Sequence, residues 1–388
     1  MKSDMTIAYL SSDDPKDRKS WSGGYYYMLT ALEKQFTTVV PLGPVKLSRM
    51  QRVFTFLSKV YNRVFPKARF DIIHSHLRAR YYAPIYEAKL REGKYDLIFA
   101  PTSSVELALL KTDIPVVYYS DTSVNQIRDY YKMFSNLSAF SSRDAETIQA
   151  KSLENSKYVI HASDWATDHV VSHYKVDRSK AFTVPMGANI DSVDDPHMFD
   201  HKIETSDTCN LLFLGVDWTR KGGPIAFDTM LELEKQGMNV TLTVCGTIPP
   251  AGISHPRLRV IPFLNKNRKE DYSRMLQLLR DTHFLVLPTR AECAGLVFAE
   301  ASAYGIPSLA TETGGVGAMV ENGVNGYRLP LEAGGEVYAN LIREIFTDKD
   351  RYQKLIRSSR AKYENELNWN VWGEKVRAII TSDKAQSR

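Results

Sequence analysis

The sequence predicts an α/β protein of two Rossmann-like domains that face each other across a cleft. Three observations predict this fold class. With 388 residues, the chain exceeds the usual size of one hydrophobic core, so two compact domains are expected. Short β-branched or aromatic runs alternate with longer helical patterns, which is typical of βαβ units on a parallel sheet. A segment with Gly and Pro at residues 185–189 and a polar run at residues 191–207 interrupt this alternation once, and it then starts again.

The first half of the chain supplies the elements of the first domain. Each expected strand is a short run rich in β-branched or aromatic residues, and each expected helix has apolar residues at helical spacing. The expected strands are residues 6–10, 37–41, 96–100, 116–120, 158–161 and 181–184, and the expected helices are residues 25–34, 49–64, 72–91 and 162–174. We place this domain at residues 1–190.

The same criteria define a second domain at residues 205–369. Its expected strands are residues 210–215, 240–245, 258–262, 284–287 and 308–311, and its expected helices are residues 224–236, 270–280 and 296–304.

Composition excludes several classes of protein. The content of 43% hydrophobic and 24% charged residues is that of an ordinary globular protein rather than a disordered one. Cys209, Cys245 and Cys293 are far apart in the sequence, so neither a disulfide framework nor a zinc site is indicated. No apolar run approaches the ~18 residues of a membrane-spanning helix. We expect a cytoplasmic protein, either free or bound peripherally to the inner face of the membrane.

Residues 286–300 place a loop at the carboxyl end of an apolar strand and directly before a helix. Open α/β sheets bind ligands there, and the helix N-terminus offers backbone N–H groups and a positive dipole end to a diphosphate. Gly295 lets the backbone approach closely because it has no Cβ. Glu292 and Glu300 would lie roughly 12 Å apart at near-helical spacing. One carboxylate could then serve sugar hydroxyls and the other ribose hydroxyls.

Two glutamates at this spacing also occur by chance in charged helices. The downstream sequence favours a nucleotide site, because Gly305 ends the helix, a short buried strand follows, and Gly314 and Gly315 form a second loop.

These motifs resemble those of family 4 of the retaining glycosyltransferases, which have the two-domain GT-B architecture. The resemblance covers nearly the whole chain. It rests on the E-x7-E element Glu292–Glu300, on Gly305-Ile306-Pro307, on Gly314-Gly315 and on residues 218–223, and it extends in the N-terminal half to residues 22–24, 163–165 and 185–191.

The resemblance implies a hexosyltransferase that uses a nucleotide-diphosphate sugar, in the first place a UDP-sugar, and transfers the sugar with retention. The acceptor would be a hydroxyl of a glycan, a lipid-linked molecule or a small molecule. Glu292 would hold the transferred sugar, Glu300 the ribose and Lys221 the diphosphate. Base contacts would come largely from the backbone of residues 262–266.

The resemblance also assigns backbone roles around the donor. N–H groups of the loop before the helix would line the phosphates and the sugar, and glycines at two other strand ends would lie near them. These residues are Cys293, Ala294, Gly295, Leu296, Gly215, Gly23 and Gly24. Residues 370–388 would form a helix that packs back on the first domain.

Two positions depart from the family pattern. Val216 stands where the family usually has an arginine after the strand glycine, and Arg220 beside Lys221 would supply that second positive charge unless it is a solvated loop residue. After the strand at residues 116–120 the family often has a histidine, whereas this chain has Asp121. Asp121 would either orient a sugar or acceptor hydroxyl or cap the next helix.

We expect no metal and no cofactor. His74 and His76 would lie on different faces of the expected helix at residues 72–91. The resembled family works without a catalytic metal, because a lysine and a helix dipole neutralise the leaving diphosphate.

A basic stretch precedes that helix. No acidic residue occurs between Glu33 and Asp71, while the interval contains Lys34, Lys46, Arg49, Arg52, Lys59, Arg63, Lys67 and Arg69. Apolar residues recur at helical spacing within it, which predicts an amphipathic helix. Residues 46–69 would contact an anionic membrane surface or an anionic acceptor, unless the apolar stripe is part of the core. No nucleic-acid reader motif is present.

Other functions fit the same architecture. They are a non-catalytic subunit that binds a sugar nucleotide, a nucleotide-sugar epimerase and a sugar phosphorylase. A phosphorylase would need a cofactor phosphate, and no lysine in this sequence lies in a motif that supports such a cofactor.

Overall fold

The computed structural model describes residues 2–191 and 207–386, with side chains to residue 382. Most of the polar run at residues 191–207 lies outside these ranges. Contacts divide the chain into two compact units. One comprises Met1–Val184 with Gly373–Arg388, and the other comprises Pro185–Trp372. The boundary therefore falls within the last helix, whose residues from Gly373 onward belong to the first unit.

The first unit contains a parallel six-stranded sheet of order β2-β1-β3-β4-β5-β6. Its central strands β3, β4 and β5 are buried at every position, as expected where helices cover both faces of a parallel sheet. The strands are β1 Ser3–Tyr9, β2 Phe36–Pro41, β3 Leu97–Pro101, β4 Val116–Ser120, β5 Tyr158–His161 and β6 Ala181–Thr183.

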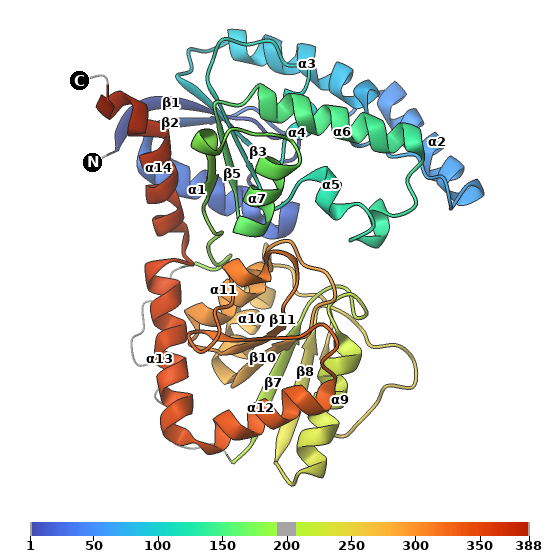
Figure 1. Ribbon diagram of the computed structural model, residues 1–388, viewed down its shortest axis with the longest axis vertical. Coiled ribbons are helices and arrows are strands. Elements are labelled where there is room, and N and C mark those ends of the chain that lie inside the picture. The colour runs from blue at the N-terminus through green and yellow to red at the C-terminus, as the bar shows by residue number, and fades with distance from the viewer. Residues whose placement is uncertain (1, 192–206, 387–388) are drawn as a thin grey trace. The chain divides into compact units, whose positions relative to one another are not determined.

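Helices α3, α4 and α6 of this unit pack against one another on one side of the sheet, and α1 lies on the other (Figure 1). Serine side chains cap several of these helices by accepting a backbone N–H bond. The helices are α1 Gly24–Gln35, α2 Arg49–Val64, α3 His76–Arg91, α4 Ser104–Leu107, α5 Val124–Ile127, α6 Ala139–Glu154, α7 Asp164–Ser172 and α14 Trp369–Gln386.

The second unit repeats the plan with a parallel six-stranded sheet of order β12-β11-β10-β7-β8-β9. Its strands are β7 Cys209–Leu214, β8 Val240–Cys245, β9 Leu258–Ile261, β10 Phe284–Leu287, β11 Ser308–Thr311 and β12 Gly326–Leu329. Its helices are α9 Gly223–Lys235, α10 Lys269–Asp281, α11 Leu296–Ala303, α12 Gly335–Thr347 and α13 Lys349–Asn365. The predicted α/β fold with two doubly wound sheets is confirmed.

The strand order of each sheet creates a switch point. In the second unit the chain runs from β7 outward to β9 and then returns to β10 on the other side of β7. In the first unit the same reversal separates β1 from β3. Loops at the carboxyl ends of such strands diverge and leave room for a ligand. The loops after β7 and β10 are the ones that contain the predicted motifs.

None of the described helices combines the length and apolar content that crossing a bilayer requires.

Candidate functional site

The loops after β7 and β10 are tied to each other at the switch point of the second unit. The Arg290 backbone N–H donates to the Arg220 carbonyl at 2.7 Å. In return, the Arg220 guanidinium donates to the Ala291 carbonyl at 2.8 Å. The Thr289 hydroxyl donates to the Ala291 carbonyl as well, at 3.0 Å. These bonds bring two segments that are distant in the sequence into one rigid edge.

Lys221 and Glu292 form an ion pair at this edge. The Lys221 ammonium donates to the Glu292 carboxylate, and the two residues are 9% and 7% exposed. The Arg220 guanidinium lies 3.7 Å from the same carboxylate oxygen and 3.7 Å from Asp217, whose side chain is half exposed. Two cations thus share one buried carboxylate, and the second carboxylate of the cluster, Asp217, is half exposed to water. Val216, by contrast, is 65% exposed.

Glycines make this packing sterically feasible. Gly222 is the N-cap of α9 with a φ of +79°, and a Cβ there would lie 2.0 Å from the Pro288 carbonyl oxygen. A Cβ at Gly215 would lie 3.1 Å from Cγ of Lys221. Gly222 therefore lets the two loops approach each other, and Gly215, directly after β7, leaves room for the Lys221 side chain.

Helix α11 begins directly after Gly295, as the sequence predicts. Gly295 is the N-cap of α11 with a φ of +80°, and a Cβ there would collide with the Phe298 ring at 2.7 Å. Cys293 and Ala294 are buried, and Leu296 is partly exposed. The Gly315 backbone N–H donates to the Glu292 carbonyl at 3.0 Å, so the Gly314-Gly315 loop fixes the position of Glu292.

Glu300 is buried in α11 and has a cationic partner of its own. Its carboxylate accepts a hydrogen bond from the Lys266 ammonium at 2.5 Å, and the same ammonium donates to the Asn189 carbonyl at 3.2 Å. Asn189 is held in turn by the Trp369 indole at 3.0 Å. Sequence reasoning gave residues 262–266 a backbone role and missed this side chain. A single lysine in a polar loop provides no signal that could have shown the contact.

Gly23 and Gly24 lie at the switch point of the first unit. Trp21, Ser22 and Gly23 all adopt positive φ values directly before α1. A Cβ at Gly24 would lie 2.7 Å from the Trp21 ring, so this glycine is required by close packing. The backbone turns sharply there, directly before α1.

Asp121 follows β4, and the structure overturns one of its two expected roles. Helix α5 is capped by Ser123, whose side chain accepts a hydrogen bond from the Gln126 N–H in a capping box. The expectation that Asp121 caps the next helix is therefore wrong. Its charge acts together with burial, the larger cause, in raising the pKa of Tyr118.

Sequence reasoning also missed a buried carboxyl group in the first unit. Glu106 lies on α4, directly after β3, and is 6% exposed. Burial raises the pKa of Glu106, and a hydrogen bond with Ser12 partly opposes that shift. The only signal in the sequence is an acid that closely follows an all-apolar strand, and this is a weak one.

His74 and His76 belong to different ion pairs. His74 bonds Asp71 at 2.8 Å, and His76 bonds Asp144. His74 precedes α3 instead of lying within it, because Ser75 caps the helix. Within residues 2–191 and 207–386, no group of three or more His, Cys, Asp and Glu side chains could hold a metal ion. That the reaction needs no metal stays a prediction.

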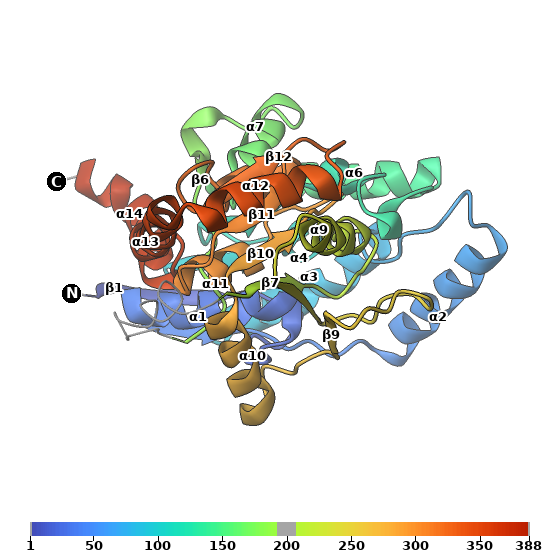
Figure 2. The ribbon, with the colours of Figure 1, turned by 90° about the horizontal axis from the view of Figure 1, so that it is seen from below.

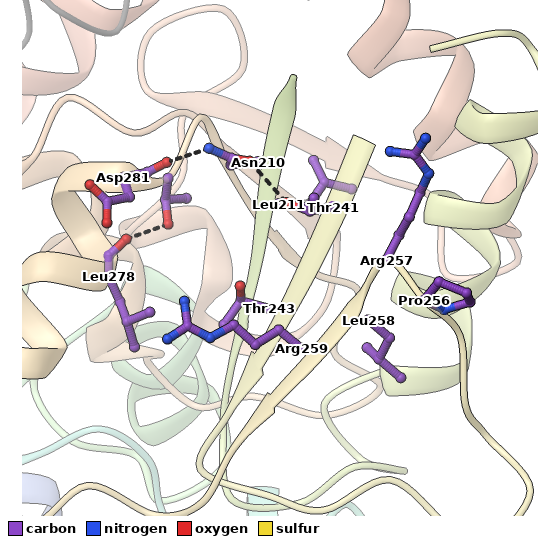
Figure 3. Close-up of a pocket in the computed structure, with 11 residues that line it drawn as sticks. Asn210, Leu211, Thr241, Thr243, Pro256, Arg257, Leu258, Arg259, Leu278 and Asp281 are labelled. Carbon is purple, nitrogen blue, oxygen red and sulfur yellow. Dashed lines mark hydrogen bonds between the residues drawn. The ribbon is translucent and has the colours of Figure 1, made fainter. Parts of the chain in front are cut away.

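A pocket of 380 Å³ in the second unit lies apart from these loops (Figure 3). It is lined by residues of β7, β8 and β9, by the segment directly before β9 and by the end of α10. Asn210 bridges the two sides, donating to the Asp281 carbonyl at 3.1 Å and accepting from the Thr241 hydroxyl at 2.9 Å. None of its lining residues belongs to the predicted donor site.

Comparisons with known proteins address the fold and the second unit. Residues 208–348 match the family model described as Glycosyl transferases group 1. Glycogen synthase of Mycobacterium tuberculosis is 26% identical over 185 residues, which are 46% of this chain and 44% of that protein. The match thus spans less than half the length of this curated relative.

Solved structures resemble nearly the whole chain. Sucrose-phosphate synthase from Thermosynechococcus elongatus has a TM-score of 0.65 and 15% identity over 98% of this chain and 100% of that one. HepE of Anabaena, in complex with UDP and glucose, has a TM-score of 0.65 and 16% identity over 97% of this chain and 100% of that one. The chain has the GT-B fold, and residues 208–348 form a domain of the glycosyl transferases group 1.

The GT-B part of the predicted resemblance is therefore confirmed. Membership of family 4, retention, and the roles of Glu292, Glu300 and the other site residues stay predictions.

Proposed function

We propose that the protein is a retaining glycosyltransferase that moves a hexosyl group from a nucleotide-diphosphate sugar, in the first place a UDP-sugar, to a hydroxyl acceptor. The acceptor is a glycan, a lipid-linked molecule or a small molecule. One observation carries the proposal. Lys221 and Arg220 converge on the buried Glu292 carboxylate at the switch point of a sheet, beside the N-terminus of α11.

The charge balance of this cluster favours a bound anion. Two cations face one buried carboxylate, and the Asp217 carboxylate is screened by water because it is half exposed. The N-terminus of α11 adds backbone N–H groups and the positive end of a dipole. A diphosphate would complete the neutralisation, and Glu292 would then exchange part of its ion pair for the hydroxyls of the sugar.

Transfer breaks the bond between the anomeric carbon and the diphosphate oxygen, and the bonding electrons leave with the diphosphate. The acceptor oxygen bonds the anomeric carbon from the same face, and its proton passes to the departing diphosphate, whose negative charge is rising. Lys221 and Arg220 stabilise that charge, which is the main electrostatic demand of the step.

A covalent glycosyl-enzyme is not favoured. The Glu292 carboxylate is engaged by two cations, which lowers its nucleophilicity, and the Cys293 side chain is buried. The double displacement of retaining glycosidases needs a free carboxylate at the anomeric centre.

The donor and its stereochemistry are tested together. We would incubate the protein with UDP-, GDP- and ADP-sugars and a panel of hydroxyl acceptors, measure the released diphosphate, and determine the anomeric configuration of the product by NMR. We expect one diphosphate and a retained configuration. An inverted product would refute retention, and tight binding without turnover would point to a non-catalytic binding subunit. A free epimerised sugar would point to an epimerase.

Calorimetry tests the site itself. Glu300→Ala should weaken binding of the nucleoside diphosphate by about tenfold or more, since it removes a buried hydrogen-bonding carboxylate. Glu336→Ala, at an exposed glutamate of α12, is the matched control and should bind normally. Equal affinity of the two variants would remove the ribose assignment.

A further inference from the structure

Helix α2 turns its apolar side chains outward. Its buried residues are the polar Gln51 and Ser58. Phe56 is 64% exposed and Val53 is 53% exposed. The other exposed apolar residues of the helix and its end are Met50, Leu57, Val60, Tyr61, Val64 and Phe65. The expectation that an apolar stripe here belongs to the core is therefore wrong.

Hydrogen bonds from the polar face hold α2 on the unit. The Arg78 guanidinium of α3 donates to the Thr55 hydroxyl at 2.9 Å. The Asn62 amide exchanges two bonds with the Phe70 backbone, at 2.6 Å and 3.0 Å. A helix fixed by its polar face keeps its apolar face available, and a contiguous exposed apolar face marks an interaction surface.

The cations of this segment flank the apolar face. Lys46, Arg49, Arg52, Lys59, Arg63 and Lys67 are exposed. None of them makes an ion pair with a residue that the structure describes. The sequence offers no acid between Glu33 and Asp71 to neutralise them. At 3.6 residues per turn, Arg52, Lys59 and Arg63 lie along one border of the stripe that contains Val53, Phe56 and Val60.

The apolar surface continues beyond the helix. Arg69 pairs its backbone with Asn136 and Ser138, which places the segment after α2 beside the segment before α6. Met133 in that second segment is 59% exposed, and Phe140 in the first turn of α6 is 66% exposed. Figures 1 and 2 both show α2 at the periphery of its unit.

We propose that the outer face of α2 is a docking surface for an anionic lipid bilayer. Lying in the plane of the interface, the helix places Val53, Phe56 and Val60 at the boundary of the acyl chains and directs its arginines and lysines to lipid phosphates. Basic residues beside an outward apolar stripe are the pattern of interfacial helices. A second copy of the chain fits this face poorly, because two surfaces with the same unneutralised positive charge repel each other.

Vesicle co-sedimentation tests the charge part. We expect binding to vesicles of phosphatidylcholine and phosphatidylglycerol in equal parts and little binding to phosphatidylcholine alone. Raising salt from about 0.1 M to about 1 M, which shortens the Debye length from about 10 Å to about 3 Å, should release the protein. K59E/R63E should lower the partition coefficient by at least about tenfold. K354E/R357E makes the same charge change on exposed residues of α13 and should bind like the wild type.

Site-specific labelling tests the apolar part. Cys209, Cys245 and Cys293 are buried, so a polarity-sensitive fluorophore attaches to a newly introduced surface cysteine. A probe on Phe56→Cys should shift to the blue with the mixed vesicles. A probe on Val337→Cys, at an exposed apolar residue of α12, should not shift.

Several results would overturn the proposal. They are absence of binding to the mixed vesicles, binding that K59E/R63E and K354E/R357E affect equally, and equal probe shifts at the two sites. Analytical ultracentrifugation without lipid could give another such result. If the protein is a dimer and Phe56→Ser dissociates it, this face is an interface between copies of the chain. Because these measurements use no sugar donor, the docking surface stands or falls independently of the proposed transferase activity.

Discussion

The edge of the β7–β10 switch point and the outer face of α2 handle charge in opposite ways. At the switch point each buried carboxylate has a cation, with Glu292 bound by Lys221 and Glu300 bound by Lys266. On α2 the cations are exposed, and none has an acidic partner among the residues that the structure describes. Apolar groups differ as well, since Ala291, Cys293 and Ala294 in the loop after β10 are buried, whereas the apolar side chains of α2 are exposed.

The difference separates two kinds of binding. A buried charge that loses its partner destabilises the protein. A small ligand that displaces the partner must therefore offer a group of matching charge and geometry, which makes binding selective. An exposed, unpaired charge stays hydrated and destabilises the fold little. It therefore suits binding to an extended surface of opposite charge. Substitutions at the first region should therefore affect folding and function together, whereas those on α2 should affect binding alone.

The largest effect is expected from Lys221→Ala. Donor turnover should fall by about 10²–10³-fold, because a charge aimed at the leaving diphosphate is lost. The free energy of unfolding should also fall by about 3–5 kcal/mol, because Glu292 is left buried without its ammonium. Donor turnover is measured by diphosphate release, and the free energy of unfolding is measured by denaturant unfolding. Lys354→Ala, at an exposed lysine, serves as the control and should change neither.

A double variant sharpens this prediction. Lys221→Met with Glu292→Gln removes both charges and should recover most of the stability but none of the activity. If the double variant regains turnover, or if Lys221→Ala is as stable as the wild type, the pair is not the buried electrostatic unit that we infer.

The next largest effect on stability is expected from replacing a glycine of the second unit by alanine. Gly222 and Gly237 have nearly the same φ, +79° and +81°. A Cβ at Gly222 meets the Pro288 carbonyl oxygen, whereas one at Gly237 meets nothing within 4 Å. Gly237→Ala should cost about 1 kcal/mol for the left-handed conformation, and Gly222→Ala about 2 kcal/mol more because the two loops must separate. Equal unfolding midpoints would show that the loops after β7 and β10 are not in contact.

A third test concerns His161, a buried group that lacks a partner. Neither ring nitrogen has a hydrogen-bond partner among the described residues, and burial lowers the pKa of His161 from 6.5 to about 3. Below pH 6.5 the unfolded chain takes up a proton that the native state excludes. The free energy of unfolding should therefore decrease as the pH is lowered below 6.5, by at most about 1.4 kcal/mol per pH unit.

His161→Leu isolates this contribution. The difference in stability between the wild type and the variant should shrink or reverse as the pH falls from 6.5 toward 4, as measured by urea unfolding at each pH. Parallel profiles would mean that His161 is hydrated or paired in solution.

Much of the fold could be predicted because buried positions of helices and strands are mostly apolar and recur at regular spacing in the sequence. Strands β4, β5, β8, β10 and β11 have the predicted bounds. All of these except β8 are buried at every position, and β8 alternates buried apolar residues with partly exposed threonines. Helix α6 was missed because its buried face includes Ser141, Gln149 and Ser152, which hide the apolar spacing. Helix α12 has Tyr338, Ile342 and Ile345 at helical spacing and could have been predicted.

The structure brings Lys221, Arg220 and Glu292 of the candidate site together, but the contacts between them could not be predicted from the sequence. The loop around Gly295 follows from a strand, a glycine and a helix in sequence. The pairing of Glu300 with Lys266 depends on how the loop after an edge strand folds across the sheet, and residue types do not encode that path. For α2 the spacing shows an apolar stripe but not whether it faces the core or the solvent, because the pattern is the same in both cases.

The smallest effect is the one that decides whether the outer face of α2 is free. Phe56→Ser should change the free energy of unfolding by no more than about 0.5 kcal/mol, because the ring is already in water. Phe99→Ser, at a fully buried residue of β3 in the same unit, should cost about 3–5 kcal/mol. Both are read from the unfolding transition of the first unit. A comparable loss at Phe56 would mean that another part of the protein covers α2 in solution, and the contrast between the two regions would then fail.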